Sequence, residues 1–270
     1  MKNTSIYWQN KEERAKTALS HTLQMQNKYR EKIAKVISKS IIYSPDKVFL
    51  PIKEKYDNID ISLVSEDSVS AIFNYSEGKT AVLNFASYKN PGGGFMAGSR
   101  AQEESLCHES FLYNVLRSFV FYYKQNTLNL NRGLYTNRAI YSPGVFFEKD
   151  NKALECDVIT CAAPNITVSQ KYTNNVSKEE NLATLDSRIR FVLDIAAENQ
   201  VDTLILGAFG CGVFGQDAED VCRIFVKYLT SSHRCFKKVI FAIPNDVHSE
   251  NYDKFFKVLT EEKEKKNEKL

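Results

Sequence analysis

Residues 90–106 of the chain read NPGGGFMAGSRAQEESL, and they follow AVLNFASY at 81–88, an apolar stretch that predicts a buried strand. The three consecutive glycines, Gly92, Gly93 and Gly94, let the backbone bend and approach other groups closely. Gln102, Glu103 and Glu104 then begin an apolar-rich segment that predicts a helix. A strand, a glycine-rich turn and a helix in succession are typical of α/β proteins, in which loops at the strand ends carry the ligand site.

The rest of the chain continues this alternation. The first 40 residues contain no Gly or Pro and predict one or two helices. Apolar strands such as TLILGAF and KVIFAI favour a central sheet covered on both faces. Strands are predicted within 61–75 and 79–88 and at 139–148, 157–164, 202–209 and 237–244, and helices over 103–126, about 180–199, about 216–232 and from Asn251 onward. We expect a helical N-terminal extension at 1–50, one main domain at 51–260 and a charged tail at 261–270.

Composition excludes several classes of protein. The formal net charge is only +3 on 270 residues, and the basic residues are spread out, which argues against a dedicated duplex-binding surface but allows a small anionic ligand. No apolar run reaches the roughly 18 residues of a membrane span, and the N-terminus lacks a signal-peptide core, so we expect a cytoplasmic protein without membrane contact. The six cysteines show no C-x-x-C spacing. We therefore expect reduced, mostly buried thiols and no metal site.

A second glycine-rich segment, LGAFGCGVFGQD at 206–217, also follows an apolar strand and precedes a predicted helix. Gly210, Gly212 and Gly215 match G-x-G-x-x-G, but no acidic residue lies about twenty residues further on, where a Rossmann site places one. A turn that only aids packing is one interpretation. The other is an anion cradle, in which backbone N–H groups and the start of the following helix face a phosphate.

The adjacent glutamates also allow two interpretations. Ser99 could be the N-cap of the helix with Gln102 at the capping-box position, and acidic residues in the first turn would offset the helix dipole. Alternatively, Glu103 and Glu104 point about 100° apart on a helix, so one could face a scissile bond while the other holds a hydroxyl group. A glycosidic bond needs a carboxyl group that donates a proton to the leaving oxygen. That role requires desolvation or nearby negative charge, because the helix dipole favours the ionised form.

Three glycines, seven intervening residues and then Gln-Glu-Glu resemble the signature of poly(ADP-ribose) glycohydrolases. The surrounding LNFASYKNPGGG and the later GAFGCGVFGQD are similar to the compact microbial-type branch of that family, and the resemblance extends from about Ile6 to Phe256. It implies a macrodomain-like, three-layer α/β/α fold with a mixed central sheet, which binds ADP-ribose in a cleft at the strand ends. No cofactor is implied.

The resemblance also implies a role for each matching residue. Glu104 would be the catalytic acid and would then activate water, and Glu103 would hold the ribose hydroxyls beside the scissile bond. Asn84 and Gln102 would support them, and Phe214 would pack against the terminal ribose. The implied substrate-binding set is Asn84, Gly92, Gly93, Gly94, Gln102, Gly210, Cys211, Gly212, Val213, Phe214 and Gly215, in which the loop 210–215 would wrap the diphosphate. The departures at CAAPN, 161–165, leave the adenine end unassigned.

The expected activity is therefore hydrolysis of ribose–ribose O-glycosidic bonds from the chain terminus, releasing ADP-ribose. The expected partner is poly(ADP-ribose) carried on protein or nucleic acid, and the expected state is a monomer. Two alternatives stay open: removal of a single ADP-ribose from modified protein or nucleic acid, and a macrodomain that binds ADP-ribose without cleaving it. The presence of Glu104 argues against a pure binder, which has no need of a catalytic acid.

Overall fold

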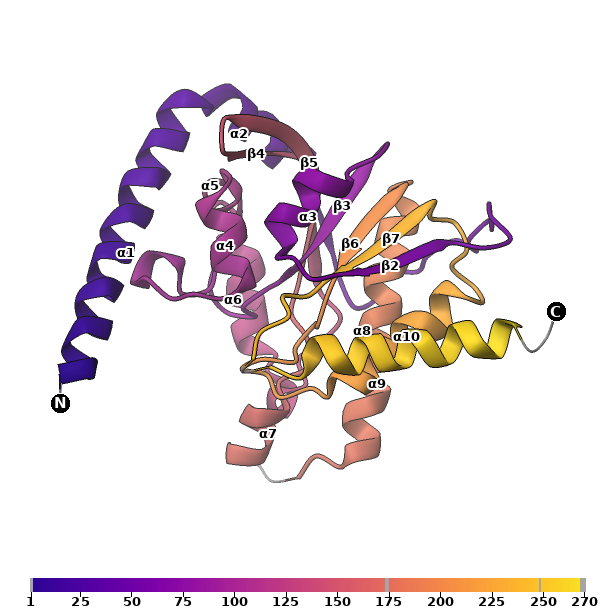
Figure 1. Cartoon of the computed structure of the whole chain (residues 1–270). Coiled ribbons are helices and arrows are strands. Elements are labelled where there is room, and N and C mark those ends of the chain that lie inside the picture. The colour runs from indigo at the N-terminus through magenta and orange to yellow at the C-terminus, as the bar shows by residue number, and fades with distance from the viewer. Residues whose placement is uncertain (1, 173–174, 248, 268–270) are drawn as a thin grey trace.

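A computed structural model describes residues 2–172, 175–247 and 249–267, and a mixed sheet lies at its centre (Figure 1). Over these residues the sheet has seven strands in the order β1-β4-β5-β3-β6-β7-β2. The pairs β1–β4 and β4–β5 are antiparallel and the others are parallel. The strands are β1 (Ile41–Tyr43), β2 (Asp60–Val64), β3 (Thr80–Phe85), β4 (Ala139–Lys149), β5 (Lys152–Cys161), β6 (Thr203–Leu206) and β7 (Lys238–Ala242).

Helices cover both faces of the sheet, as Figure 1 shows for α1 and α2 on one side and α9 and α10 on the other. Side chains alternate along β3: Leu83 packs into the core cluster beneath α8, α9 and α10, and Val82 packs into the cluster beneath α1 to α6. The predicted three-layer α/β/α, macrodomain-like fold is confirmed. The helices are α1 (Lys2–Lys28), α2 (Arg30–Lys39), α3 (Ser68–Tyr75), α4 (Gln102–His108), α5 (Leu112–Leu116), α6 (Val120–Leu128), α7 (Ile166–Tyr172), α8 (Lys178–Glu198), α9 (Ala218–Leu229) and α10 (Asn251–Asn267), with short 3₁₀ turns η1 (Phe95–Ala97) and η2 (Asn131–Gly133).

The predicted helix over 103–126 is wrong in its continuity, because α4, α5 and α6 replace it. Ser110 lies at the first break, where its hydroxyl donates to the Leu106 carbonyl and its backbone forms a bridge with Phe147 of β4. A serine hydroxyl that competes for helix carbonyls favours such a break. The resulting kinks let α4, α5 and α6 all pack against one face of the sheet.

The predicted strand within 61–75 is also only partly right. It ends as β2 at Val64, and residues 68–75 form α3 instead. Asp67 is the N-cap of that helix, since its carboxylate accepts from the Ser70 backbone N–H at 2.9 Å. The apolar residues of α3 are therefore buried on one side of a helix rather than of a strand.

The N-terminal segment packs directly onto the sheet. Ala18 and Met25 of α1 are buried in the core cluster with α4 and α5, and β1 adds an edge strand next to β4. The α1 helix also crosses η1, where a Cβ on Gly98 would lie 2.1 Å from the Lys11 carbonyl oxygen. The proposed division into 1–50, 51–260 and 261–270 stays a prediction.

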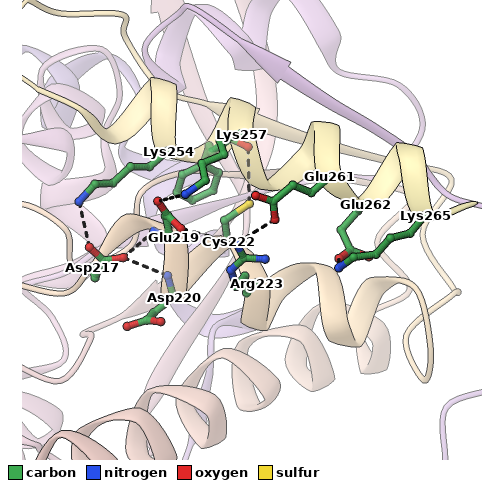
Figure 2. Close-up of polar contacts among 11 residues, drawn as sticks. Asp217, Glu219, Asp220, Cys222, Arg223, Lys254, Lys257, Glu261, Glu262 and Lys265 are labelled. Atoms are coloured by element: carbon green, nitrogen blue, oxygen red, sulfur yellow. Dashed lines mark hydrogen bonds and ion pairs between the residues drawn. The ribbon is translucent and has the colours of Figure 1, made fainter.

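Figure 2 shows the polar contacts between α9 and α10. Lys254 binds Asp217 at 2.9 Å, Lys257 binds Glu219 at 2.9 Å, and Arg223 binds Glu261 at 2.9 Å. Most of the expected charged tail is thus helical as far as Asn267, and its first residue, Glu261, contacts α9. Among the described residues, no helix combines the length and the apolar character that a membrane crossing requires.

Candidate active site

A pocket of about 660 Å³ lies at the carboxyl ends of β3, β6 and β7. The segments that follow these strands form its walls, together with the first turns of α3 and α4. This is where ligands bind in sheets of this type. Most of the predicted site residues line it: Gly93, Gly94, Gln102, Glu103, Glu104, Gly210, Gly212, Val213 and Phe214.

Glu104 lines the pocket, and only one of its two carboxylate oxygens forms a hydrogen bond among the described residues. Its Oε1 accepts a hydrogen bond from the Gly94 backbone N–H at 2.8 Å. Its Oε2 is buried and has no hydrogen-bond partner among the described residues. A buried polar atom without a partner is costly and rare in a folded protein. An unpaired oxygen on a residue that lines a pocket is suited to carry a proton or to bond a ligand hydroxyl.

Glu103 also lines the pocket, and it is held more firmly than Glu104. Its Oε2 accepts from the Ser87 backbone N–H at 2.7 Å, and its Oε1 accepts from Asn84 Nδ2 at 3.2 Å. Only 3% of Glu103 is exposed. Burial, with a smaller contribution from the neighbouring Glu104, raises the pKa of Glu103 from its ordinary value of 4.5 to about 8, although the bonds from Ser87 and Asn84 act in the opposite direction.

Gly93 allows both carboxylates to sit against the backbone. Its φ is +59°, a conformation that favours glycine. A Cβ at this position would lie 2.7 Å from Glu104 Oε1 and 2.9 Å from Glu103 Oε2. The glycine run therefore makes room for the two acids.

The start of α4 differs from the predicted capping box. The N-cap is Ala101, which has no side chain able to bond the helix, so Ser99 does not cap it. Gln102 is instead the first helical residue, and its Nε2 donates to the Leu83 carbonyl at 2.8 Å while its Oε1 accepts from the Phe85 N–H at 2.9 Å. Gln102 thus ties α4 to β3 and aims the two glutamates that follow it.

The loop 210–216 presents donors to the opposite side of the pocket. Within the described residues, the backbone N–H groups of Gly212, Val213 and Phe214 have no acceptor in the protein. Gly210 and Gly215 have φ of +79° and +76° and turn the chain at either end. Consecutive unpaired N–H groups in a turn form an anion-binding concavity.

The start of α9 is capped by a side chain of the protein itself. Asp217 is its N-cap and accepts from the backbone N–H groups of Glu219 and Asp220, as Figure 2 shows. The same carboxylate binds Lys254. Because a protein carboxylate already occupies this helix terminus, the loop N–H groups remain as the donors for an anion.

Some predicted residues lie outside the pocket lining. Asn84 is fully buried behind Glu103, and Gly92 packs against Tyr113 and Cys107. Gly215 packs against Thr167 and Ile166, and Cys211 does not reach the pocket. These four residues therefore do not line the pocket.

Sequence reasoning missed the remaining wall of the pocket. The first turn of α3 and the segment after β7 carry no motif, and the capping pattern of Asp67 was the one available signal, because it places a helix start at a strand end. These two segments contribute Asp67, Ser68, Val69, Ile243, Pro244, Asp246, Ser249 and Asn251 to the lining.

Comparison with known proteins agrees with this geometry. Residues 9–150 match the model of the microbial-type PARG catalytic domain. A search of curated proteins found no match.

Solved structures of poly(ADP-ribose) glycohydrolases superpose on most of the chain. The Thermomonospora curvata enzyme is 26% identical, with 92% of this chain and 99% of that chain covered and a TM-score of 0.82. The same enzyme bound to the inhibitor ADP-HPD gives a TM-score of 0.79 at 26% identity, covering 91% of this chain and 99% of that one. The Deinococcus radiodurans enzyme in complex with ADP-ribose is 31% identical, with 85% and 97% covered and a TM-score of 0.75.

The family match spans more than half of the chain, and it includes the glycine run and the Gln-Glu-Glu segment that form the carboxylate wall of the pocket. This chain therefore belongs to the microbial-type poly(ADP-ribose) glycohydrolase family.

Proposed function

We propose that the protein hydrolyses the ribose–ribose O-glycosidic bonds of poly(ADP-ribose), with Glu104 as the acid that protonates the leaving oxygen. The supporting observation is the state of its carboxyl group: Oε1 is fixed by the Gly94 N–H, and the buried Oε2 has no partner among the described residues. A carboxyl group that is fixed at one atom and unpaired at the other, in a residue that lines the pocket, can present its second oxygen to substrate after a small rotation of the side chain.

In this proposal Glu104 acts twice. As the bond between the anomeric carbon and the leaving oxygen breaks, protonated Glu104 transfers its proton to that oxygen. The resulting carboxylate then takes a proton from the water that attacks the anomeric carbon, which regenerates the acid. Positive charge develops on the ribose ring in between, and the Glu104 carboxylate that is left after proton transfer stabilises it.

Glu103 positions the sugar. It is anchored to the Ser87 N–H and to Asn84, so it holds its place when the ribose enters. The pKa of Glu103 is raised to about 8, which allows its carboxyl to be neutral at physiological pH. A neutral carboxyl can donate a hydrogen bond to a ribose hydroxyl as well as accept one from it.

The loop 210–216 holds the diphosphate that follows the ribose. The N–H groups of Gly212, Val213 and Phe214 supply donors without any cationic side chain. The pocket volume of about 660 Å³ falls within the roughly 300–1,000 Å³ range of small-ligand sites. We infer that the pocket accepts a single ADP-ribose unit and that release proceeds from the chain terminus, by a monomer, whether the polymer is carried on protein or on nucleic acid.

The test compares the wild type with Glu104→Gln on three substrates: automodified poly(ADP-ribose), mono-ADP-ribosylated protein and ADP-ribosylated DNA. We expect the wild type to release free ADP-ribose from polymer, and the variant to lose about 10²–10⁴-fold in rate, the usual contribution of a general acid. Calorimetric affinity for ADP-ribose should change little, because the glutamine keeps the size of the side chain.

Each other outcome contradicts a defined part of the proposal. If the wild type cleaved only the mono-ADP-ribosylated protein or the ADP-ribosylated DNA, its substrate would be a single ADP-ribose on that carrier and not the polymer. Binding without cleavage by both proteins would make the chain a reader of ADP-ribose. Early appearance of long oligomers, rather than monomeric ADP-ribose, would contradict release from the terminus.

A further inference from the structure

Three aromatic rings form a continuous wall behind the pocket. Tyr88 and Tyr135 stack face to face, with ring centroids 4.0 Å apart and planes 11° apart. Tyr135 in turn meets the edge of Phe214 at 6.2 Å and 66°. Phe214 lines the pocket, whereas the two tyrosines do not. The tyrosine pair is thus the support on which a pocket residue rests.

The backbone of Tyr135 is strained. Its φ is +60°, in the left-handed region that a bulky aromatic residue rarely adopts. Such a conformation persists only where the surrounding structure imposes it. Four hydrogen bonds around the residue do so. The Tyr135 N–H donates to the Leu130 carbonyl at 3.2 Å, and the Tyr135 carbonyl accepts from Asn131 Nδ2 at 3.2 Å. On either side of it, the Leu134 carbonyl accepts from Arg188 Nη2 at 3.2 Å, and the Thr136 N–H donates to Tyr88 Oη at 3.3 Å.

The same wall is joined to the carboxylate side of the site. Tyr88 directly follows Ser87, whose N–H binds Glu103 at 2.7 Å. The Tyr88 carbonyl accepts from the buried Asn126 Nδ2 at 2.8 Å, and its hydroxyl donates to the Asn129 carbonyl at 3.1 Å. Tyr88 is therefore fixed at both its backbone and its ring. A rigid path runs from Glu103 through Ser87, Tyr88 and Tyr135 to Phe214.

We propose that Tyr135, stacked on Tyr88, is a positioning residue that sets the distance between Phe214 and the two glutamates, and so the width of the ribose end of the pocket. This rests on the proposed function and on the packing of the terminal ribose against Phe214 that the family resemblance implies. The pair touches no substrate. It acts through Phe214, and the strain at Tyr135 is retained because a relaxed backbone would turn the ring out of the stack.

The experiment uses Tyr135→Leu, which keeps apolar volume but removes the planar ring, and Tyr135→Phe, which keeps the ring. Turnover of poly(ADP-ribose) and calorimetric affinity for ADP-ribose are measured for both, and again in a Phe214→Leu background. We expect Tyr135→Leu to lose about tenfold in kcat/KM through misplacement of the ribose, and Tyr135→Phe to stay within about threefold. In the Phe214→Leu background, Tyr135→Leu should add less than about a twofold loss, because residues that act through one contact are not additive.

Tyr43→Leu is the matched control. Tyr43 stacks on Phe49 at 5.9 Å and 13°, is 2% exposed and lies outside the pocket lining. Loss of the Tyr43 ring should lower the melting temperature and leave kcat/KM within about twofold of the wild type, because this stack lies away from the pocket and contributes to stability alone. An equal kinetic loss in Tyr43→Leu, or multiplicative losses in the Tyr135→Leu and Phe214→Leu double variant, would overturn the proposal.

The two proposals fail in different ways. If the wild type binds ADP-ribose but cleaves no polymer, the proposed function fails, and the ADP-ribose affinities of the same variants still decide the role of Tyr135. If the wild type cleaves polymer and Tyr135→Leu matches it in both measurements, the proposed function stands and the positioning role is rejected.

Discussion

The two glycine-rich segments of the pocket use the same residue for opposite purposes. At Gly92, Gly93 and Gly94, protein side chains crowd the backbone so closely that any Cβ would meet one within 2.8 Å. At Gly212, a Cβ would meet nothing within 4 Å. The first segment makes room for the protein's own side chains, and at Gly93 these are the two carboxylates. The second segment is crowded at Gly210 and Gly215 but leaves open space at Gly212.

Gly93→Ala should have the largest effect, because it attacks the crowded segment. The new methyl group would displace Glu103 and Glu104 together, and an alanine at φ +59° is itself strained. We expect about a hundredfold loss in turnover of poly(ADP-ribose), in line with misplacement of catalytic groups by about 1 Å. The free energy of unfolding should fall by about 1–3 kcal/mol, measured by urea denaturation.

Gly144→Ala separates strain from crowding. Gly144 has φ of +70°, and a Cβ there would only approach Glu155 Oε2 at 3.5 Å. This control should lose about 1–2 kcal/mol of stability through the backbone alone and retain full turnover. Equal turnover in the Gly93 and Gly144 variants would refute the idea that Gly93 exists to seat the glutamates.

The next prediction concerns the pH dependence that burial of Glu103 creates. Its pKa rises from 4.5 to about 8 on folding, so between these values the folded protein holds a proton that the unfolded chain has lost. Stability conferred by this site is therefore present below about pH 4.5 and decreases as the pH rises toward about 8, by up to about 1.4 kcal/mol per pH unit.

Glu103→Gln removes this dependence, since the amide does not titrate. Melting temperatures of both proteins between pH 5 and pH 8.5 provide the measurement. The variant should gain stability relative to the wild type as the pH rises, and the difference should level off above about pH 8. A difference that stays constant over the whole range would mean that Glu103 ionises normally in the folded protein.

Local patterns predicted the parts of this molecule that local chemistry decides. Apolar runs such as TLIL of β6 became buried strands, and the segment Gln102–Glu104 became the start of a helix at the pocket. The continuous helix over 103–126 failed because Ser110 bonds Leu106 and pairs with Phe147, a contact between distant segments. Periodicity alone carries no information about such a contact.

The aromatic wall was not predictable for the same reason. Nothing in LNRGLYTN indicates that Tyr135 takes a left-handed conformation, because that conformation depends on Tyr88, Arg188 and Asn131 together. The Ser99 cap failed because Gln102 bonds β3 instead of its own helix. Residues whose roles depend on several distant partners were missed. Most residues of the two glycine-rich motifs line the pocket, but Gly92, Cys211 and Gly215 do not, and the roles of all of them stay predictions.

Gly212→Ala should have the smallest effect on the folded protein, and it sharpens the comparison most. No atom lies within 4 Å of the new methyl group, and replacing glycine at an unstrained position restricts the unfolded chain. Stability in urea should therefore stay unchanged or rise by up to about 1 kcal/mol. Affinity for ADP-ribose, measured by calorimetry, should nevertheless fall severalfold, because the methyl group enters the space next to the unpaired N–H groups of Val213 and Phe214.

Gly210→Ala serves as the contrast, since its methyl group would lie 2.6 Å from Ala163 Cβ and should lower stability and affinity together. If Gly212→Ala binds ADP-ribose as tightly as the wild type, the open space is not where the diphosphate lies, and the division between a crowded and an open glycine segment loses its functional meaning.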